Sequence, residues 1–254
     1  MRHPLSHPSS SSPIGISITE YRGPENSQFH EYTIDIHGTP LSTTVTPNPQ
    51  IVHQWIQTTL RLNARRKNNN LVVGLGVQCR PPSYRDEEPP AAALVLCVGR
   101  RCLVFQLLHS PNVPNILRRF LVNPSHTFVG FWNQSDGHKL MHCSEHSLSV
   151  GQHLIDLRSH AVSRYDGRRL DRASRETIVR ECLGLDVDFD SWEMSYNWES
   201  YVLEDKQIMY AAADAYCSSL LGENMRIREI CMKMEWKMRI WEFIKVLKGY
   251  NLAI

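Results

Sequence analysis

Residues 207–216 read Gln-Ile-Met-Tyr-Ala-Ala-Ala-Asp-Ala-Tyr, and this stretch decides the fold. Alanine favours the helix more than any other residue, so the three alanines between Tyr210 and Asp214 predict an α-helix. Residues four positions apart share one helix face. The sequence therefore places the Tyr210 phenol beside the Asp214 carboxylate, a pair suited to hold and orient a metal-bound water. Taken alone, the pattern fits a buried tyrosine beside a surface aspartate better.

Two apolar segments predict strands of a central sheet. Residues 71–78 are apolar and β-branched, which is typical of a buried central strand. Residues 127–131 predict a second strand, and the polar segment after it contains Asp136 and enters a helix. Further strands are expected at 31–37, 40–46, 92–98, 102–107 and 153–157, and further helices at 48–62, 115–120 and about 134–147. These elements predict an α/β fold with a mixed sheet flanked by helices.

The order of a strand, a second strand with an aspartate, and a helix with Tyr-x-x-x-Asp resembles the 3′–5′ exonuclease domain of the DEDD superfamily, tyrosine subclass. Werner-syndrome-type exonucleases, especially the short plant versions, are the nearest group. The resemblance covers about residues 30–222 and includes Val72–Leu75, Cys79–Pro81, Ile155–Arg158, Asn197-Trp198 and the 207–216 stretch. It implies a ribonuclease-H-like fold, Mg²⁺ or Mn²⁺ as the cofactor, and nucleic acid 3′ ends as the partner.

The family's site residues map onto this chain only in part. The resemblance implies Asp136 and Asp214 as metal ligands and Tyr210 as the catalytic phenol. The family's first strand carries Asp-x-Glu, and these two positions are Gly76 and Gln78 here. Glycine supplies no ligand, and a neutral amide oxygen is a poor substitute for a carboxylate on a hard divalent ion. The first motif is therefore degenerate.

The missing carboxylates bear directly on catalysis. Phosphodiester hydrolysis in this family uses two metal ions ~3.5–4 Å apart, and the missing aspartate normally bridges them. Trp132 stands where the family has a small glycine, and its indole would fill part of the cleft. We therefore expect a protein that binds nucleic acid 3′ ends with weak or absent cleavage and weak or absent Mg²⁺ or Mn²⁺. Two alternatives stay open: an active Werner-type 3′–5′ exonuclease and a non-catalytic protein-interaction scaffold.

Basic residues cluster in two places, although the net charge is only +2. Arg65 and Arg66 belong to a basic group at 61–67. A second stretch contains Arg158, Arg164, Arg168, Arg169, Arg172, Arg175 and Arg180. One interpretation is a basic rim along a nucleic-acid backbone, with Arg65, Arg66, Arg168 and Arg169 as contacts. The other is a set of solvated helix faces that acidic neighbours partly balance.

Composition indicates one large domain with tails. The 254 residues are 42% hydrophobic, and they contain neither an apolar run long enough for a membrane span nor a signal-peptide core. We expect a disordered or loosely ordered tail at 1–28, the exonuclease-like domain at 29–222 and an amphipathic helix at 223–254. This helix packs on the domain, pairs with a second copy or binds a protein partner. The seven cysteines form no Cys-x-x-Cys and indicate a reduced nuclear or cytoplasmic protein.

Three histidines recur at four-residue steps in the predicted helix at 134–147, namely His138, His142 and His146. Such spacing occurs in zinc sites, but the glutamate of His-Glu-x-x-His is missing here. We therefore expect a polar helix face that binds no zinc.

Overall fold

The computed structural model describes residues 15–23, 29–64, 70–85, 87, 89–131, 133–142, 146–151, 154–189 and 197–227. The strands are β1 (Ile16–Arg22), β2 (His30–Ile36), β3 (Thr39–Thr46), β4 (Val72–Gln78), β5 (Ala93–Val98), β6 (Arg101–Gln106), β7 (Thr127–Gly130) and β8 (Leu154–Asp156). The helices are α1 (Pro49–Asn63), α2 (Asn115–Leu121), α3 (Asn133–Met141), α4 (Arg175–Leu183) and α6 (Asp205–Asn224), with 3₁₀ turns η2 (Leu107–His109) and η3 (Leu157–His160).

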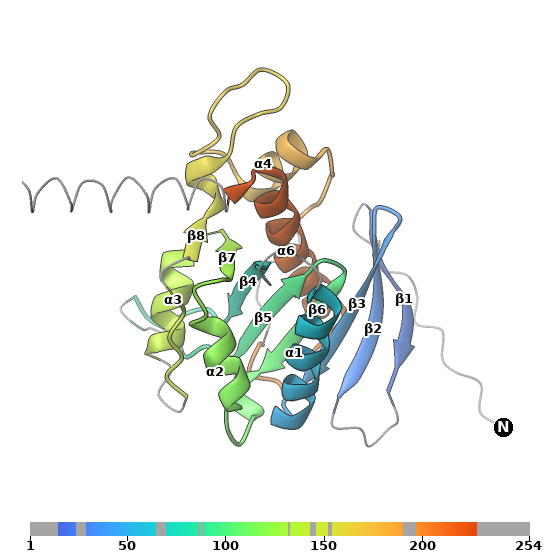
Figure 1. Ribbon diagram of the computed structural model, residues 1–254, viewed down its shortest axis with the longest axis vertical. Coiled ribbons are helices and arrows are strands. Elements are labelled where there is room, and N and C mark those ends of the chain that lie inside the picture. Colours follow the sequence, from blue (N-terminus) through green and yellow to red (C-terminus); the bar gives the residue numbers. More distant parts are fainter. Residues whose placement is uncertain are drawn as a thin grey trace, which may run out of the picture.

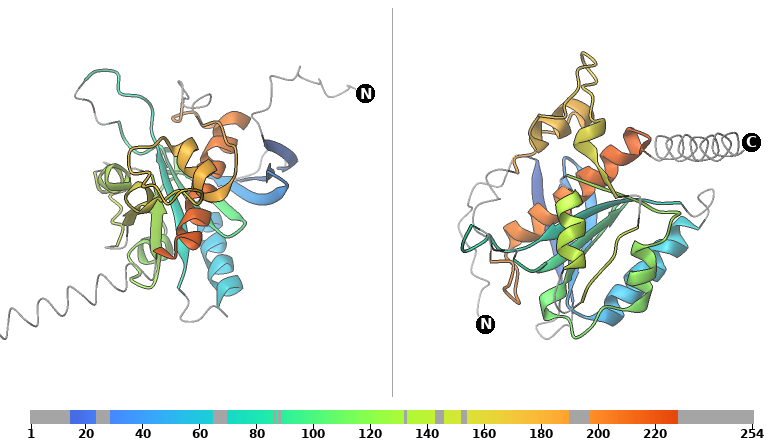
Figure 2. Two further views of the ribbon diagram at one scale, coloured as in Figure 1. Left: turned by 90° about the horizontal axis from the view of Figure 1, so that it is seen from above. Right: turned by 90° about the vertical axis from the view of Figure 1, so that its left-hand side faces the viewer.

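The strands form one mixed sheet in the order β1-β2-β3-β6-β5-β4-β7-β8 (Figure 1). The pairs β3/β6, β4/β7 and β7/β8 are parallel, and the remaining neighbours are antiparallel. Helices cover both faces: α1 and α2 lie on one side and α6 crosses the other (Figure 2). The predicted α/β architecture, a mixed sheet flanked by helices, is confirmed.

The side chains of β4 point alternately into two hydrophobic cores, one on each face of the sheet. Val73, Leu75 and Val77 belong to the core beneath α1 and α2, whereas Val72 belongs to the core beneath α6. Successive side chains of a strand point to opposite faces, so the remaining residues of β4, Gly74, Gly76 and Gln78, face α6. The whole strand is buried, as its apolar sequence predicted.

Helix α6 lies unusually close to β4 because Gly74 has no side chain. A Cβ atom at Gly74 would lie only 1.8 Å from the Ala215 backbone oxygen. The helix begins with a capping box, in which the Gln207 side chain accepts a hydrogen bond of 2.8 Å from the Glu204 backbone N–H. Its alanine-rich middle, predicted from the sequence, is fully buried. Small residues on both elements thus set the position of the helix over the sheet.

Three expectations need correction or fall outside the described residues. Strand β1 lies within the range 1–28 assigned to a tail, and it pairs with β2 along the edge of the sheet. Helix α3 ends at Met141 rather than near 147, so the three histidines do not share one helix. His146 is instead buried in the following loop, where its Nε2 lies 3.1 Å from the Leu107 carbonyl oxygen. Of the C-terminal helix predicted at 223–254, the first two residues belong to α6, which ends at Asn224, and the part beyond Ile227 lies outside the described residues.

Two other observations concern the described chain as a whole. The five described cysteines, Cys79, Cys97, Cys102, Cys182 and Cys217, are free, and three of them are buried. None of the described helices combines the length and the apolar character that a membrane crossing requires.

Candidate functional site

Helix α6 and strand β4 form two walls of the candidate site. Tyr210 and Asp214 lie one turn apart on α6, and both are buried. A Cβ atom at Gly76 would lie 3.2 Å from Asp214 Oδ2 and 3.7 Å from Gln78 Nε2. The structure therefore places Gly76 close to the carboxylate of the helix, with the Gln78 amide beside the same position.

Helix α3 brings Asp136 to the same place. Burial is the main reason that the pKa of Asp136 rises from 3.8 to about 7, and the negative charge of Asp214 adds to the rise. Lys139, a hydrogen bond with the Val77 backbone and the charge of Arg175 act in the opposite direction on this pKa.

Arg175 is the residue of this site that sequence reasoning placed wrongly. It was grouped with a basic rim, but it is buried and points at α6. Its Nη1 donates hydrogen bonds to Tyr210 Oη at 3.0 Å and to Asp214 Oδ1 at 3.1 Å. A signal for this inward orientation was present, because Ile178 and Val179 lie three and four residues later on α4 and are also buried.

Aromatic rings surround the Tyr210 phenol. The Phe189 ring meets the Tyr210 ring edge to face at 6.1 Å, and the Trp198 ring centroid lies 6.3 Å from it. Arg175 Cζ lies 4.7 Å from the Phe189 ring centroid and 5.3 Å from that of Tyr210. The phenol and the guanidinium are therefore held by packing as well as by their hydrogen bond.

The described residues around the site offer fewer carboxylates than a two-ion metal centre uses. Among the described residues, no group of three or more His, Cys, Asp or Glu side chains is placed to hold a metal ion. Glu87, in the loop after β4, does not supply a further metal ligand. Its carboxylate accepts hydrogen bonds from Arg80 and from the Ser83 backbone N–H. Asp136 and Asp214 are the two carboxyl groups that the structure brings together here.

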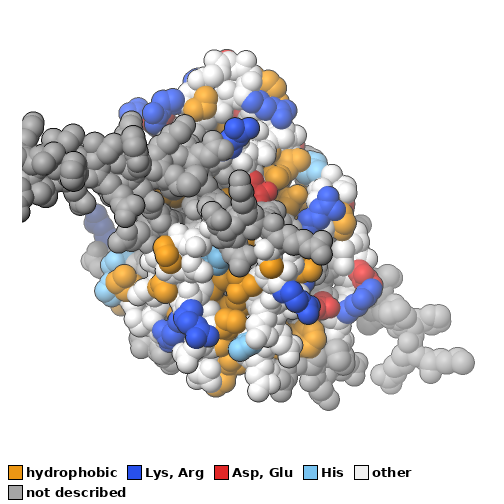
Figure 3. Space-filling view, viewed as in Figure 1, with side chains coloured by type: hydrophobic (Ala, Val, Ile, Leu, Met, Phe, Trp, Pro, Cys, Tyr) orange, Lys and Arg blue, Asp and Glu red, His pale blue; other side chains and the backbone are white. Residues whose placement is uncertain are grey.

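The structure describes two of the four arginines that are expected to contact nucleic acid. Arg168 and Arg169 are exposed, and together with Arg172 they line a hollow just before the start of α4. Their ion pairs with Asp166 and Asp171 are long, at 3.8 and 3.7 Å, and exposed to solvent. Lys and Arg side chains lie at the upper end of the molecule and also over the rest of this face in the space-filling view (Figure 3). Arg65, Arg66 and Trp132 lie outside the described residues.

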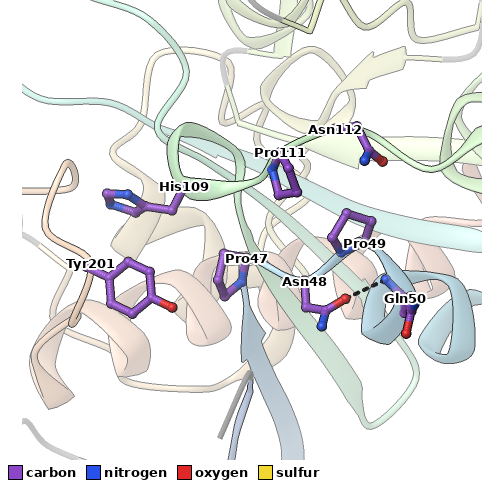
Figure 4. A pocket seen from close by; sticks show the side chains of 8 residues that line it. All are labelled: Pro47, Asn48, Pro49, Gln50, His109, Pro111, Asn112 and Tyr201. Carbon is purple, nitrogen blue, oxygen red and sulfur yellow. Dashed lines mark hydrogen bonds between the residues drawn. The ribbon is translucent and has the colours of Figure 1, made fainter. Parts of the chain in front are cut away.

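A second hollow lies at the end of the sheet where β4 also ends. Gln78 is in register with Ala93, and Ala93 with Gln106, so the two glutamines occupy the same row of the sheet. Gln106 Nε2 donates a hydrogen bond of 2.8 Å to the Tyr201 carbonyl oxygen. The hollow is lined by Pro47, Asn48, Pro49, Gln50, His109, Pro111, Asn112 and Tyr201 (Figure 4). Its lining carries no Asp, Glu, Lys or Arg, so the charged chemistry lies between α6 and β4 instead.

Comparison with known proteins identifies relatives over the same region. The chain is 29% identical over 188 residues to Exonuclease 3′-5′ domain-containing protein 2 of Drosophila melanogaster, a match that covers 73% of this chain and 30% of that protein. It is 28% identical over 160 residues to a 3′-5′ exonuclease of Arabidopsis thaliana, which covers 62% of this chain and 54% of the relative. The matches thus span less than two thirds of either relative.

A solved structure with a similar fold and a family profile also match this chain. Escherichia coli RNase D, described as an exoribonuclease involved in structured RNA processing, superposes with a TM-score of 0.56 at 16% identity, over 76% of this chain and 49% of RNase D. This likeness supports the ribonuclease-H-like fold. The profile of the 3′-5′ exonuclease family matches residues 76–227, which is more than half of the chain. The chain belongs to the 3′–5′ exonuclease family.

Proposed function

We propose that this chain binds the 3′ ends of nucleic acids, and that its metal-dependent phosphodiester hydrolysis is weak or absent. One observation carries the proposal: a Cβ atom at Gly76 would lie 3.2 Å from Asp214 Oδ2 and 3.7 Å from Gln78 Nε2, and the tyrosine subclass carries Asp and Glu where this chain has Gly76 and Gln78. Exonucleases of this family work with divalent metal ions, and Brucella melitensis NrnC, a neighbour in fold, was solved with bound Mg²⁺.

The ligand chemistry supports weak catalysis. A pair of ions stabilises both the attacking and the leaving oxygen only if several carboxylates offset its charge and one of them bridges it. Asp136 and Asp214 are two carboxylates, and Gly76 and Gln78 add no negative charge to them. The proposed roles are therefore those of ligand positions for Asp136 and Asp214, a positioned phenol for Tyr210, and two lost ligand positions at Gly76 and Gln78.

The retained parts of the fold support nucleic-acid binding. The basic hollow formed by Arg168, Arg169 and Arg172 precedes α4, whose first residue reaches the candidate site. Exposed arginines with long, solvated ion pairs exchange their partners for phosphate groups at little cost. A bound strand would therefore run from this hollow towards the site between α6 and β4.

The test uses 5′-labelled single strands and recessed duplexes, of DNA and of RNA, with Mg²⁺ or Mn²⁺. The natural protein should bind these substrates and should shorten them no faster than Asp214→Asn. Metal-dependent trimming that Asp214→Asn removes would instead establish the active exonuclease. Absence of both binding and cleavage would favour the protein-interaction scaffold.

A further inference from the structure

The two functional groups of α6 share a single buried cation. Arg175 Nη1 donates to Tyr210 Oη at 3.0 Å and to Asp214 Oδ1 at 3.1 Å. The Arg175 side chain is only 7% exposed and that of Asp214 only 11%. Charges seldom lie so far from water unless a partner neutralises them. Each of these two side chains therefore depends on the other for its burial.

Stacking fixes the guanidinium in this position. It lies over the faces of Phe189 and Tyr210, with Cζ 4.7 and 5.3 Å from the two ring centroids. A planar guanidinium stacks on aromatic rings far better than an ammonium group does. Moving Arg175 out of the site would therefore break cation–π contacts as well as two hydrogen bonds.

A divalent ion on Asp214 would compete with this arrangement. Mg²⁺ requires near-octahedral oxygen ligands at about 2.0–2.1 Å. Asp214 Oδ1 already accepts from the guanidinium, and Oδ2 faces the position of Gly76, which supplies no further oxygen. A second cation beside the guanidinium would also be repelled in a poorly hydrated site. The negative charge of Asp214 is met instead by the Arg175 guanidinium, with Nη1 3.1 Å from Oδ1.

We propose that Arg175 is the resident cation of this site, holding Asp214 and Tyr210 in place of a divalent ion, so that the site excludes Mg²⁺ and Mn²⁺ and nucleic acid binds without them. The missing carboxylates explain why the site does not hold two metal ions. Arg175 explains why it does not hold even one metal ion. The chain excludes Mg²⁺ and Mn²⁺ even when no nucleic acid is bound. The claim that nucleic acid binds without these ions rests on the proposed function.

Mn²⁺ binding to the full chain, followed by the electron paramagnetic resonance of free Mn²⁺, tests this directly. Arg175→Met removes the charge at similar length, and Arg175→Lys keeps the charge as the matched control. The natural protein and Arg175→Lys should bind no Mn²⁺ at millimolar concentration, whereas Arg175→Met should gain at least about tenfold in affinity. Asp214→Asn added to Arg175→Met should abolish the gain. Stoichiometric Mn²⁺ binding by the natural protein would overturn the proposal.

A second measurement avoids the loss of stability that Arg175→Met causes by leaving Asp214 without its cation. The Tm of the natural protein should be the same in Mn²⁺ and in EDTA, and so should its affinity for a labelled single strand. A rise of Tm in Mn²⁺ that Asp214→Asn removes would refute the resident cation.

The two proposals fail separately. If the natural protein binds nucleic acid without cutting it, but folded Arg175→Met gains no Mn²⁺ affinity, the resident cation is wrong and the proposed function stands. If no DNA or RNA binds while Arg175→Met gains Mn²⁺ as expected, the proposed function is wrong and metal exclusion stands.

Discussion

Helix α6 and strand β4 form opposite walls of one site, and their side chains differ sharply. The α6 wall carries a phenol and a carboxylate, Tyr210 and Asp214, that match the family's motif. The β4 wall carries Gly76 and Gln78, which we propose stand where active relatives carry two carboxylates. The walls nevertheless pack together closely, because Gly74 lets the helix backbone approach. Packing thus depends on Gly74, whereas the proposed ligand positions are Gly76 and Gln78, so the fold does not depend on a carboxylate at either of those two positions.

The largest effect should come from the residue that permits this approach. Gly74→Ala would place a Cβ atom 1.8 Å from the Ala215 backbone oxygen, so α6 would have to move away from the sheet. We expect a loss of about 3 kcal/mol or more in the free energy of unfolding, measured in urea. Gly76→Ala is the matched control, because its Cβ would lie no nearer to any neighbour than 3.2 Å, the distance to the Asp214 side chain. Equal losses in both variants would contradict the distinction between a packing glycine and a ligand position.

The next effect concerns the carboxyl group that faces both walls. In the folded chain the pKa of Asp136 rises from 3.8 to about 7, chiefly because the group is buried. Between these values the folded chain binds more protons than the unfolded chain, so this group's contribution to stability is present at low pH and is lost as the pH rises towards 7.

Asp136→Asn should remove this dependence. Between pH 5 and pH 8, in EDTA, the natural protein should lose about 2.6 kcal/mol of unfolding free energy relative to the variant. Asp171→Asn, at an exposed aspartate, is the control and should behave as the natural protein does. A natural protein whose stability relative to Asp136→Asn is flat over this range would show that Asp136 does not titrate there.

The next prediction concerns the introduction of two carboxylates on β4. Gly76→Asp with Gln78→Glu places two carboxylates opposite Asp214, since both positions lie on the same side of β4. We expect Mg²⁺-dependent trimming of 3′ ends to rise at least about tenfold, a barrier change of roughly 1.4 kcal/mol. Adding Arg175→Met should raise it further, and Asp214→Asn in the same background should abolish it. The comparison of the walls breaks down if the natural protein already trims as fast as these folded variants.

Sequence reasoning found the two walls for clear physical reasons. The alanine run of α6 and the apolar run of β4 are strong local signals that do not depend on distant partners. Strand β1 was missed because it lies at the sheet edge, where most of its residues are exposed and polar. Arg175 was misplaced because a buried charge requires a partner, and its partner Asp214 is 39 positions away in the chain. Such a pair becomes visible only when the fold brings α4 against α6.

The smallest effect should appear in the basic hollow before α4. Arg168 and Arg169 line this hollow, and their ion pairs with aspartates are long and solvated. If both contact phosphates, Arg168→Ala and Arg169→Ala should each weaken binding of a labelled strand by about threefold to tenfold at low salt. The slope of log affinity against log salt should fall by about 1 for each change. Stability should hardly change, because both side chains are exposed.

The matched control for these two variants is Arg22→Ala, at another exposed arginine, on the edge strand β1. Loss of any surface arginine lowers the net charge equally, so a purely global effect would weaken binding by the same factor in all three variants. A local phosphate contact changes the salt slope only for Arg168 and Arg169, because only contacts formed in the complex release counterions. Equal slopes in the three variants would remove the hollow from the binding surface. The difference between the α6 wall and the β4 wall would then bear on metal binding and not on the path of a bound nucleic acid.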